Sequence, residues 1–278
     1  MRSLPFIALL SILLSCDQAA YRELSPAWLR ISPAEVQAAQ GSAFSPHAVR
    51  EAWIYIDDLF AGAYPLPAHI PLLETGAGKS IKIFPGIRDF GILSRPEIYT
   101  PLDPFVLTAS LEAGKEYGIQ PVFRYKSGLR FHVHDGFESG NPFAFDLDDY
   151  KQNHITRSTA QALEGEYSGL IMLNKANPLL EAGTPAFSLN ASSYLELSFR
   201  STMDFNIGIQ LTRSGASLKD YFLLLKASGE WKTVCIPFRE ILDRYAGDAF
   251  QVLLRAELPA SSDESLIYLD LIKILSQP

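Results

Sequence analysis

Cysteine is scarce in this chain. Only Cys16 and Cys235 occur among 278 residues, so at most one disulfide can form. Cys235 lies in the alternating apolar and polar run 231–237, which is typical of a strand. A reactive thiol needs a neighbouring base and an exposed setting, whereas a cysteine in such a strand usually packs as a small core residue. We therefore predict that Cys235 belongs to the core.

Basic charge is also in deficit. The 24 Lys and Arg residues face 31 Asp and Glu residues, and the formal net charge is −7. Recognition of nucleic acid depends on clustered Lys and Arg, so no nucleic-acid partner is expected. The same deficit excludes electrostatic attraction to anionic lipid head groups. The hydrophobic content of 47% excludes a wholly disordered chain, and the length fits one or two domains.

The motifs of familiar enzymes are missing. The sequence contains no G-x-S-x-G nucleophile elbow and no H-E-x-x-H zinc motif. Residues 76–80 read Gly-Ala-Gly-Lys-Ser, but Leu73 stands where a phosphate-binding loop needs glycine, and a strand-like run follows. A hairpin turn is expected there instead. The sequence predicts a protein that is not an enzyme, and no catalytic residue is assigned.

Long apolar runs are absent too. None approaches the roughly 20 residues that a membrane-spanning helix needs. An apolar run does extend over residues 6–14, interrupted by Ser11 and preceded by the positive charge of Arg2. Its length and flanks are those of a signal-peptide core.

This apolar run closes on Leu13-Leu14-Ser15-Cys16. The tetrapeptide resembles the lipobox of bacterial lipoproteins, in which the cysteine is acylated and becomes the first residue of the mature chain. The resemblance implies a signal peptide at 1–15, lipidation of Cys16, a tether at 16–25 and attachment to the membrane through the acyl chains. An ordinary secreted protein is the alternative. The expected location is the cell envelope, on a bacterial membrane, preferably the outer one, facing the periplasm or the surface.

Helical periodicity is nearly absent. Short runs with period-two alternation recur along the chain between Gly, Pro, Asn, Asp and Ser residues, and in the second half only residues 239–245 look helical. This pattern predicts an all-β protein. Ser127-Gly128 separates two sets of runs, so we expect a small β-sandwich over 26–127 and a two-sheet jelly roll over 128–278.

Residues 53–86 carry a first resemblance to known proteins. They contain Trp-Ile-Tyr-Ile-Asp-Asp from residue 53, Gly-Ala-Tyr-Pro-Leu-Pro from residue 62 and Lys-Ile-Phe-Pro-Gly-Ile from residue 82. The segment resembles a group of uncharacterised bacterial lipoproteins and, in outline, PEGA-type surface domains with an Ig-like sandwich. This resemblance implies a spacer or interaction module.

The second half carries another resemblance. Its opening strand ends in Asp-Gly-Phe-Glu at 135–138, and the runs 194–199, 231–238 and 267–272 follow. Together they resemble carbohydrate-binding jelly rolls of the galactose-binding-like type. The resemblance implies the jelly-roll fold and, as one hypothesis, glycan binding.

Alternation also groups polar side chains. If the later strands are neighbours, one sheet surface carries charged and amide groups beside an aromatic ring, which is the combination that sugar recognition uses. The candidate ligand-binding residues are Glu196, Arg200, Gln210, Tyr221, Arg255 and Glu257. The alternative is an ordinary solvated sheet face with cross-strand ion pairs.

Two carboxylates match positions that hold a structural calcium ion in such jelly rolls, namely Glu138 and Asp270. Calcium requires six to eight oxygen ligands, and the others are not identifiable from sequence. The alternative is that both residues cap turns. No other cofactor is predicted.

These observations leave two hypotheses for function. In the first, a lipid-anchored envelope protein binds a polysaccharide through its jelly roll, and the first sandwich holds it away from the membrane. In the second, a structural or interaction lipoprotein uses both sandwiches to dock envelope proteins. An exposed apolar patch or edge strand in the first sandwich would favour the second hypothesis.

Overall fold

The computed structural model describes residues 25–38, 47–148, 150, 153–213, 216–245 and 249–278. The predicted signal peptide, Cys16 and nearly all of the predicted tether lie outside these residues, so their lipidation stays a prediction. Within the described part of the chain, no helix is both long and apolar enough to cross a membrane.

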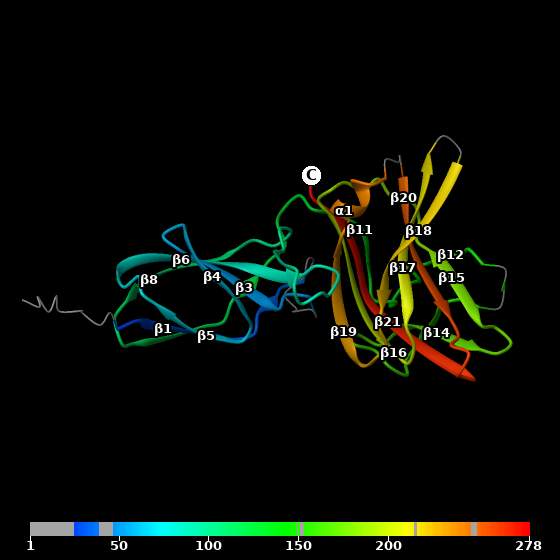
Figure 1. Cartoon of the computed structure of the whole chain (residues 1–278), viewed down its shortest axis with the longest axis horizontal. Helices are drawn as coiled ribbons and strands as arrows, with labels where there is room; N and C mark the ends of the chain where they lie inside the picture. The colour runs from blue at the N-terminus through cyan, green and yellow to red at the C-terminus, as the bar shows by residue number, and fades with distance from the viewer. Residues whose placement is uncertain (1–24, 39–46, 149, 151–152, 214–215, 246–248) are drawn as a thin grey trace, which may run out of the picture.

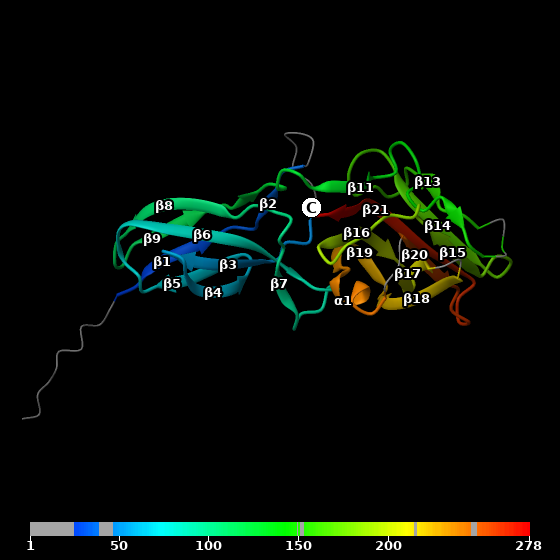
Figure 2. The same cartoon turned by 90° about the horizontal axis from the view of Figure 1, so that it is seen from above.

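The described chain consists almost entirely of strands, which confirms the all-β prediction. Its one helix within these residues is α1 (Arg239–Leu242), a single turn inside the segment that the sequence marks as helical. Figure 1 shows two groups of sheets placed end to end, and Figure 2 shows the same arrangement from above. We call them the N-terminal sandwich (residues 25–125) and the jelly roll (residues 130–278).

Among the described residues, the N-terminal sandwich has ten strands in three sheets. One sheet has the order β4-β3-β6-β7 with β8 pairing β6, the second has the order β5-β1-β9, and β10 pairs β2. The strands are β1 (Ala27–Ile31), β2 (Glu35–Val36), β3 (Glu51–Ile56), β4 (Leu59–Pro65), β5 (Ala68–Leu72), β6 (Gly76–Arg88), β7 (Pro96–Ile98), β8 (Phe105–Leu111), β9 (Glu116–Ile119) and β10 (Val122–Phe123).

Local sequence explains the hairpin from β3 to β4. Ile54 and Ile56 alternate into the core, and the turn residues Asp57 and Asp58 have φ values of 49° and 66°. Asp tolerates this left-handed conformation better than most residues, and the two-residue turn matches the twist of a hairpin. The hairpin turn predicted at 76–80 is wrong, because β6 already begins at Gly76 and pairs with β8 across a register shift.

The jelly roll contains two sheets facing each other. The proximal sheet, which contacts the N-terminal sandwich, has the order β13-β14-β21-β16-β19 with β11 pairing β21. The distal sheet has the order β12-β15-β20-β17-β18. The strands are β11 (Arg130–Asp135), β12 (Phe145–Asp146), β13 (Thr156–Ser158), β14 (Ser168–Asn174), β15 (Leu179–Gly183), β16 (Ser193–Ser201), β17 (Phe205–Arg213), β18 (Ala216–Leu225), β19 (Ser228–Pro237), β20 (Ala249–Glu257) and β21 (Glu264–Ser276).

Period-two alternation builds the core between these sheets. From the proximal sheet come Leu197, Phe199 and Leu269, and from the distal sheet come Ile207 and Leu254, all 2% exposed or less. Burying each of these side chains is worth roughly 1.5–3 kcal/mol before the entropy of ordering is counted. Because alternate side chains of the distal sheet point into this core, the side chains between them point outward, away from the proximal sheet.

The two units share apolar packing. Tyr194, Cys235 and Leu275 belong to the jelly roll but pack into the core of the N-terminal sandwich. The backbone N–H of Phe90 donates to the carbonyl oxygen of Cys235 at 3.1 Å, so the N-terminal sandwich covers part of the edge strand β19. Cys235 is 1% exposed, which confirms it as a core residue, and burial raises the pKa of its thiol.

Candidate functional site

Glu196 does not lie on a surface open to solvent. It is 2% exposed on β16 of the proximal sheet, where the N-terminal sandwich covers it. Lys273 Nζ lies 3.2 Å from its Oε2. From the N-terminal sandwich, the hydroxyl of Tyr99 donates to Glu196 Oε1, and that of Tyr125 does so at 2.9 Å. The prediction that Glu196 lines an exposed face is therefore wrong, because long-range strand pairing puts β16 in the sheet that the other unit covers.

The electrostatics of this pair are balanced. Burial alone would raise the pKa of Glu196, but the Lys273 charge and the hydrogen bonds from Tyr99, Tyr125 and Lys273 outweigh it and hold the pKa below its ordinary value. A buried ion pair persists only when its remaining hydrogen-bond capacity is met. Two tyrosines from the other unit meet it here, so this cluster joins the two units.

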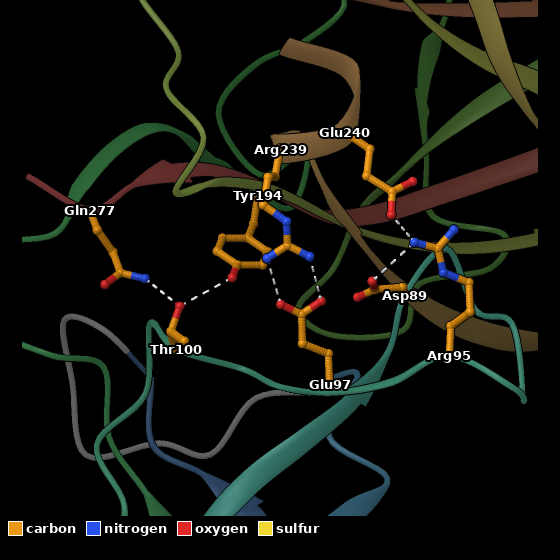
Figure 3. A network of polar contacts seen from close by, with 8 residues as sticks. All are labelled: Asp89, Arg95, Glu97, Thr100, Tyr194, Arg239, Glu240 and Gln277. Atoms are coloured by element: carbon orange, nitrogen blue, oxygen red, sulfur yellow. Dashed lines mark hydrogen bonds and ion pairs between the residues drawn. The ribbon is translucent and has the colours of Figure 1, made fainter. Parts of the chain in front are cut away.

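Figure 3 shows a further set of polar contacts between the two units. Arg239 of α1 donates to both carboxylate oxygens of Glu97, at 2.8 and 3.1 Å. Arg95 of the N-terminal sandwich reaches Glu240 of α1. The Thr100 hydroxyl lies 3.1 Å from that of Tyr194. These contacts belong to the interface between the units.

Arg200 also lies on the proximal sheet, at the other end of β16. Its Nη1 donates to Gln161 Oε1 at 2.6 Å. It borders a cavity of about 230 Å³ that Ser201, Leu266 and Tyr268 also line. Arg200 is therefore separated by the jelly-roll core from the outer face of the distal sheet, and the prediction that it shares one surface with Arg255 is wrong.

The other four predicted residues do lie together on the outer face of the distal sheet. Gln210 is on β17, Tyr221 on β18, and Arg255 and Glu257 on β20. The register supports this grouping. Gln210 pairs with Gln251, and Arg255 lies four residues further along β20, so both side chains of β20 point to the same face as Gln210. Arg255 Nη2 lies 3.2 Å from Glu257 Oε2.

Glu181, which the sequence reasoning missed, is the centre of this face. It sits on β15 with 7% exposure, beside Arg255 in the register of β15 and β20. Arg255 Nη1 is 3.8 Å from its Oε2, and Lys219 of β18 contacts its Oε1. The sequence does carry a signal for this residue. Glu181 is the one carboxylate in the short apolar run 179–183, and a charge that is buried on a strand needs a partner of opposite charge.

The contact between Lys219 and Glu181 crosses the outer face of the distal sheet. Between β15 and β18 lie β20 and β17, so the two strands are three spacings apart, or roughly 14 Å. A Lys and a Glu side chain that lean toward each other cover about this distance, and curvature of a sheet toward its outer side shortens it. We call this surface the concave polar face, formed by Glu181, Gln210, Lys219, Tyr221, Gln251, Arg255 and Glu257.

Tyr221 lies across the floor of the concave polar face. A Cβ atom at Gly208 would come within 2.7 Å of Tyr221 Cδ1 and 2.5 Å of the Asp220 carbonyl oxygen, so only glycine allows the ring to lie there. The Tyr221 hydroxyl faces Glu181 without reaching a hydrogen bond of normal geometry with any described residue, and Gln210 Oε1 likewise has no such partner. Burial, followed by the Glu181 charge, raises the pKa of Tyr221.

Glu138 and Asp270 interact electrostatically, and backbone N–H groups donate to three of their four carboxylate oxygens. Asp270 Oδ2 accepts from Leu163 at 2.8 Å and from Glu164 at 3.2 Å. Glu138 Oε1 accepts from the next residues of the same loop, Glu166 and Tyr167, at 2.8 and 2.9 Å. Burial raises the pKa of Asp270 despite these donors. A calcium ion would need the lone pairs that these N–H groups take, so the donor set does not fit the ion.

Comparisons with known proteins give little to identify the chain. No protein-family model matches it, and no curated protein does. The xylan-binding domain of Paenibacillus barcinonensis Xyn10C is 11% identical with a TM-score of 0.40, over 55% of this chain and 99% of that domain. A family 22 carbohydrate-binding module of Clostridium thermocellum Xyn10B is 16% identical with a TM-score of 0.37, over 52% and 92%.

A further solved structure of this kind is a module in complex with β-1,4-galactotriose. It is 16% identical with a TM-score of 0.37, over 53% of this chain and 99% of the module. At these identities and scores the similarity identifies no ligand for this chain. The likeness of residues 53–86 to PEGA-type domains stays a prediction.

Proposed function

We propose that the jelly roll binds a glycan on the concave polar face. The observation that carries this proposal is that Gln210 Oε1 and the Tyr221 hydroxyl, both buried on that face, have no hydrogen bond of normal geometry to any described residue. Buried polar atoms almost always have partners, so a pair without them marks a place where a ligand or ordered water completes the bonds. Sugar hydroxyls both donate and accept, and they suit this mixture of groups.

The remaining residues fit defined roles in this proposal. Glu181 accepts hydrogen bonds and is held in place by Lys219 and Arg255. Arg255 and Lys219 are each 37% exposed at their side chains, so they can donate to a ligand while still paired. Tyr221 offers a ring for contact with the apolar side of a pyranose. The binding residues of the proposal are Glu181, Gln210, Lys219, Tyr221, Arg255 and Glu257.

The test uses the chain from residue 17 onward and measures thermal unfolding with a panel of neutral polysaccharides. A ligand that binds only the native state raises the melting temperature by mass action. The proposal expects at least one neutral glycan to do so, and Arg255→Met to weaken its binding roughly tenfold, as loss of a hydrogen bond to a charged group does.

The matched control is Arg200→Met, which removes the same charge from the proximal sheet. It should leave the affinity for that glycan unchanged. If no neutral glycan shifts the unfolding of the wild-type chain, or if Arg200→Met weakens binding as much as Arg255→Met, the proposal is wrong.

Lipid anchoring belongs to the same proposal and rests on the sequence of residues 1–16. We propose that Cys16 is acylated and that its acyl chains hold the protein on a bacterial membrane. Cells expressing the full chain should incorporate labelled palmitate into it, and Cys16→Ser should abolish both the label and the membrane fraction. A label that persists in Cys16→Ser would contradict the anchor.

Protein docking remains a second candidate function, because the N-terminal sandwich carries an exposed aromatic cluster. Phe60 is 55% exposed, and its ring centroid lies 5.7 Å from that of Trp53 and 5.3 Å from that of Tyr55. The cluster lies at β4, which ends its sheet, and edge strands beside apolar side chains are places where partners add. Phe60→Ser should then lower recovery of an envelope protein cross-linked to this chain, with glycan affinity unchanged.

A further inference from the structure

A cavity of about 330 Å³ opens between the N-terminal sandwich and the jelly roll. Arg50 and Arg88 line it from the N-terminal sandwich, and Trp231 and Lys232 line it from the edge strand β19. Its walls are fixed on both sides, because β19 is hydrogen-bonded to the N-terminal sandwich at Cys235. This cavity is separate from the concave polar face, which belongs to the other sheet of the jelly roll.

The cavity carries an excess of positive charge in an acidic protein. Three cationic residues line it, and among the described residues only Arg88 has a carboxylate partner, with Arg88 Nε 3.2 Å from Glu51 Oε1. Arg50 Nη1 instead donates to the backbone carbonyl oxygens of His47 and Val49, each at 2.9 Å. Neither Arg50 nor Lys232 forms an ion pair with any residue that the structure describes.

The positive charges of the Arg50 and Arg88 guanidinium groups repel each other. Partial burial, followed by the neighbouring charge of Arg88, lowers the pKa of Arg50. Like charges placed together are costly unless an anion compensates them. The backbone carbonyls hold the Arg50 side chain in place, so the positive charge is already positioned before any ligand arrives.

Trp231 gives the cavity an aromatic surface, which a simple inorganic anion would leave without a contact. Ligand pockets combine apolar or aromatic walls with a few polar groups that fix orientation. Here the aromatic wall stands beside guanidinium and ammonium groups, which pair well with a carboxylate. The ligand that matches both features is a ring with an apolar side and one carboxylate.

We propose that this cavity binds an acidic sugar residue, with its carboxylate between Arg50 and Lys232 and its ring against Trp231. The proposal does not rest on glycan binding at the concave polar face. It assigns a different ligand class to a different pair of walls, and the two sites can fail independently.

The experiment is a calorimetric titration of the chain from residue 17 onward with three probes: galacturonate, its neutral methyl ester and acetate. Galacturonate should bind measurably, whereas the ester lacks the charge and acetate lacks the ring, so each should bind at least tenfold more weakly. Raising the salt concentration should weaken galacturonate binding.

Variants separate this site from the rest of the molecule. Lys232→Gln should weaken galacturonate binding roughly tenfold. The control Lys175→Gln removes another exposed lysine, which is paired with Asp263, and should change nothing. Arg255→Met, which tests the concave polar face, should also leave galacturonate binding unchanged.

Three results would overturn the proposal. They are no binding of galacturonate at tens of millimolar, equal binding of acetate and galacturonate, and equal affinities for galacturonate in Lys232→Gln and the wild type. If Arg255→Met loses neutral-glycan binding and keeps galacturonate binding, the result supports two separate sites. If Lys232→Gln loses galacturonate binding and keeps neutral-glycan binding, the result supports the site in this cavity.

Discussion

Two clusters of charged and aromatic residues in the jelly roll differ in how well their polar atoms are satisfied. At the interface, Glu196 and Lys273 are almost fully buried, and two tyrosines complete their hydrogen bonds. On the concave polar face, the buried Glu181 pairs with the partly exposed Lys219 and Arg255, while Gln210 and Tyr221 keep buried atoms that no described residue hydrogen-bonds in normal geometry.

The difference separates structure from recognition. A satisfied and covered network has no capacity left for a ligand, and breaking it exposes the full cost of a buried charge. An open network with unmet capacity gains when a ligand completes it. Charged residues near tyrosines are therefore not enough to indicate a ligand site. Whether each buried polar atom already has a hydrogen-bond partner distinguishes the two clusters.

The largest expected effect is at the interface. Glu196→Gln leaves the Lys273 charge buried without its partner, and we expect a loss of about 3–5 kcal/mol in the free energy of unfolding. Urea denaturation measures it. The double variant Glu196→Gln with Lys273→Met should recover part of the loss, since no unpaired charge then remains. Equal stability of Glu196→Gln and the wild type would remove the distinction between the two clusters.

The next effect is pH-dependent. Asp89 is 4% exposed at the interface, and burial, followed by the adjoining Glu97 carboxylate, raises its pKa from 3.8 to about 7. Between these values the native state holds a proton that the unfolded chain has lost, so this group makes stability fall as pH rises from about 4 to 7. At about 1.4 kcal/mol per tenfold change in proton affinity, the loss is at most roughly 4 kcal/mol.

Asp89→Asn should abolish this loss, so the variant should be more stable than the wild type at pH 8 and similar to it at pH 4. Urea unfolding across this range tests the expectation. His47, whose pKa burial and then the Arg50 charge lower to about 4, acts in the opposite sense below pH 6.5. Its contribution cancels when the two proteins are compared at one pH. A constant difference at all pH values would contradict the assignment.

A matched pair of tyrosines sharpens the comparison further. Tyr221→Phe removes a hydroxyl without a normal partner, so stability should change little while the Kd for a neutral glycan rises severalfold. Tyr125→Phe removes a hydroxyl that donates to Glu196 and accepts from Lys273, so it should cost about 1–3 kcal/mol of stability with the Kd unchanged. The reverse pattern would exchange the roles of the two clusters.

The smallest expected effect concerns calcium. Because backbone N–H groups donate to both oxygens of Asp270 and to one of Glu138, we expect neither EDTA nor millimolar calcium to move the melting temperature. Calcium-dependent stabilisation that is lost in Asp270→Asn would show that the loop rearranges to admit the ion.

Local alternation was enough to predict much of the fold. It identified the all-β class and the short helical segment near Arg239, and it turned Ile207, Ile209 and Leu211 toward the core, where all are buried. Alternation has no information on which strands become neighbours, because that depends on contacts far apart in sequence. Glu196 and Arg200 alternate outward like Gln210, yet β16 pairs with β19 and β21 in the other sheet.

Two further features lay beyond local reasoning. The covering of the proximal sheet depends on Tyr99 and Tyr125, which are remote from Glu196 in sequence. The importance of Glu181 depends on its contact with Lys219 of β18, a strand that is not its neighbour in the sheet. Both arise from tertiary packing, and no period or motif near those residues encodes them.

The most direct test of the central claim is amide chemical-shift mapping during titration with a neutral glycan that raises the melting temperature. If the concave polar face binds it, the shifted amides should lie on β15, β20, β17 and β18, around Glu181, Tyr221 and Arg255. Shifts confined to the proximal sheet around Arg200, or to the N-terminal sandwich, would contradict the account.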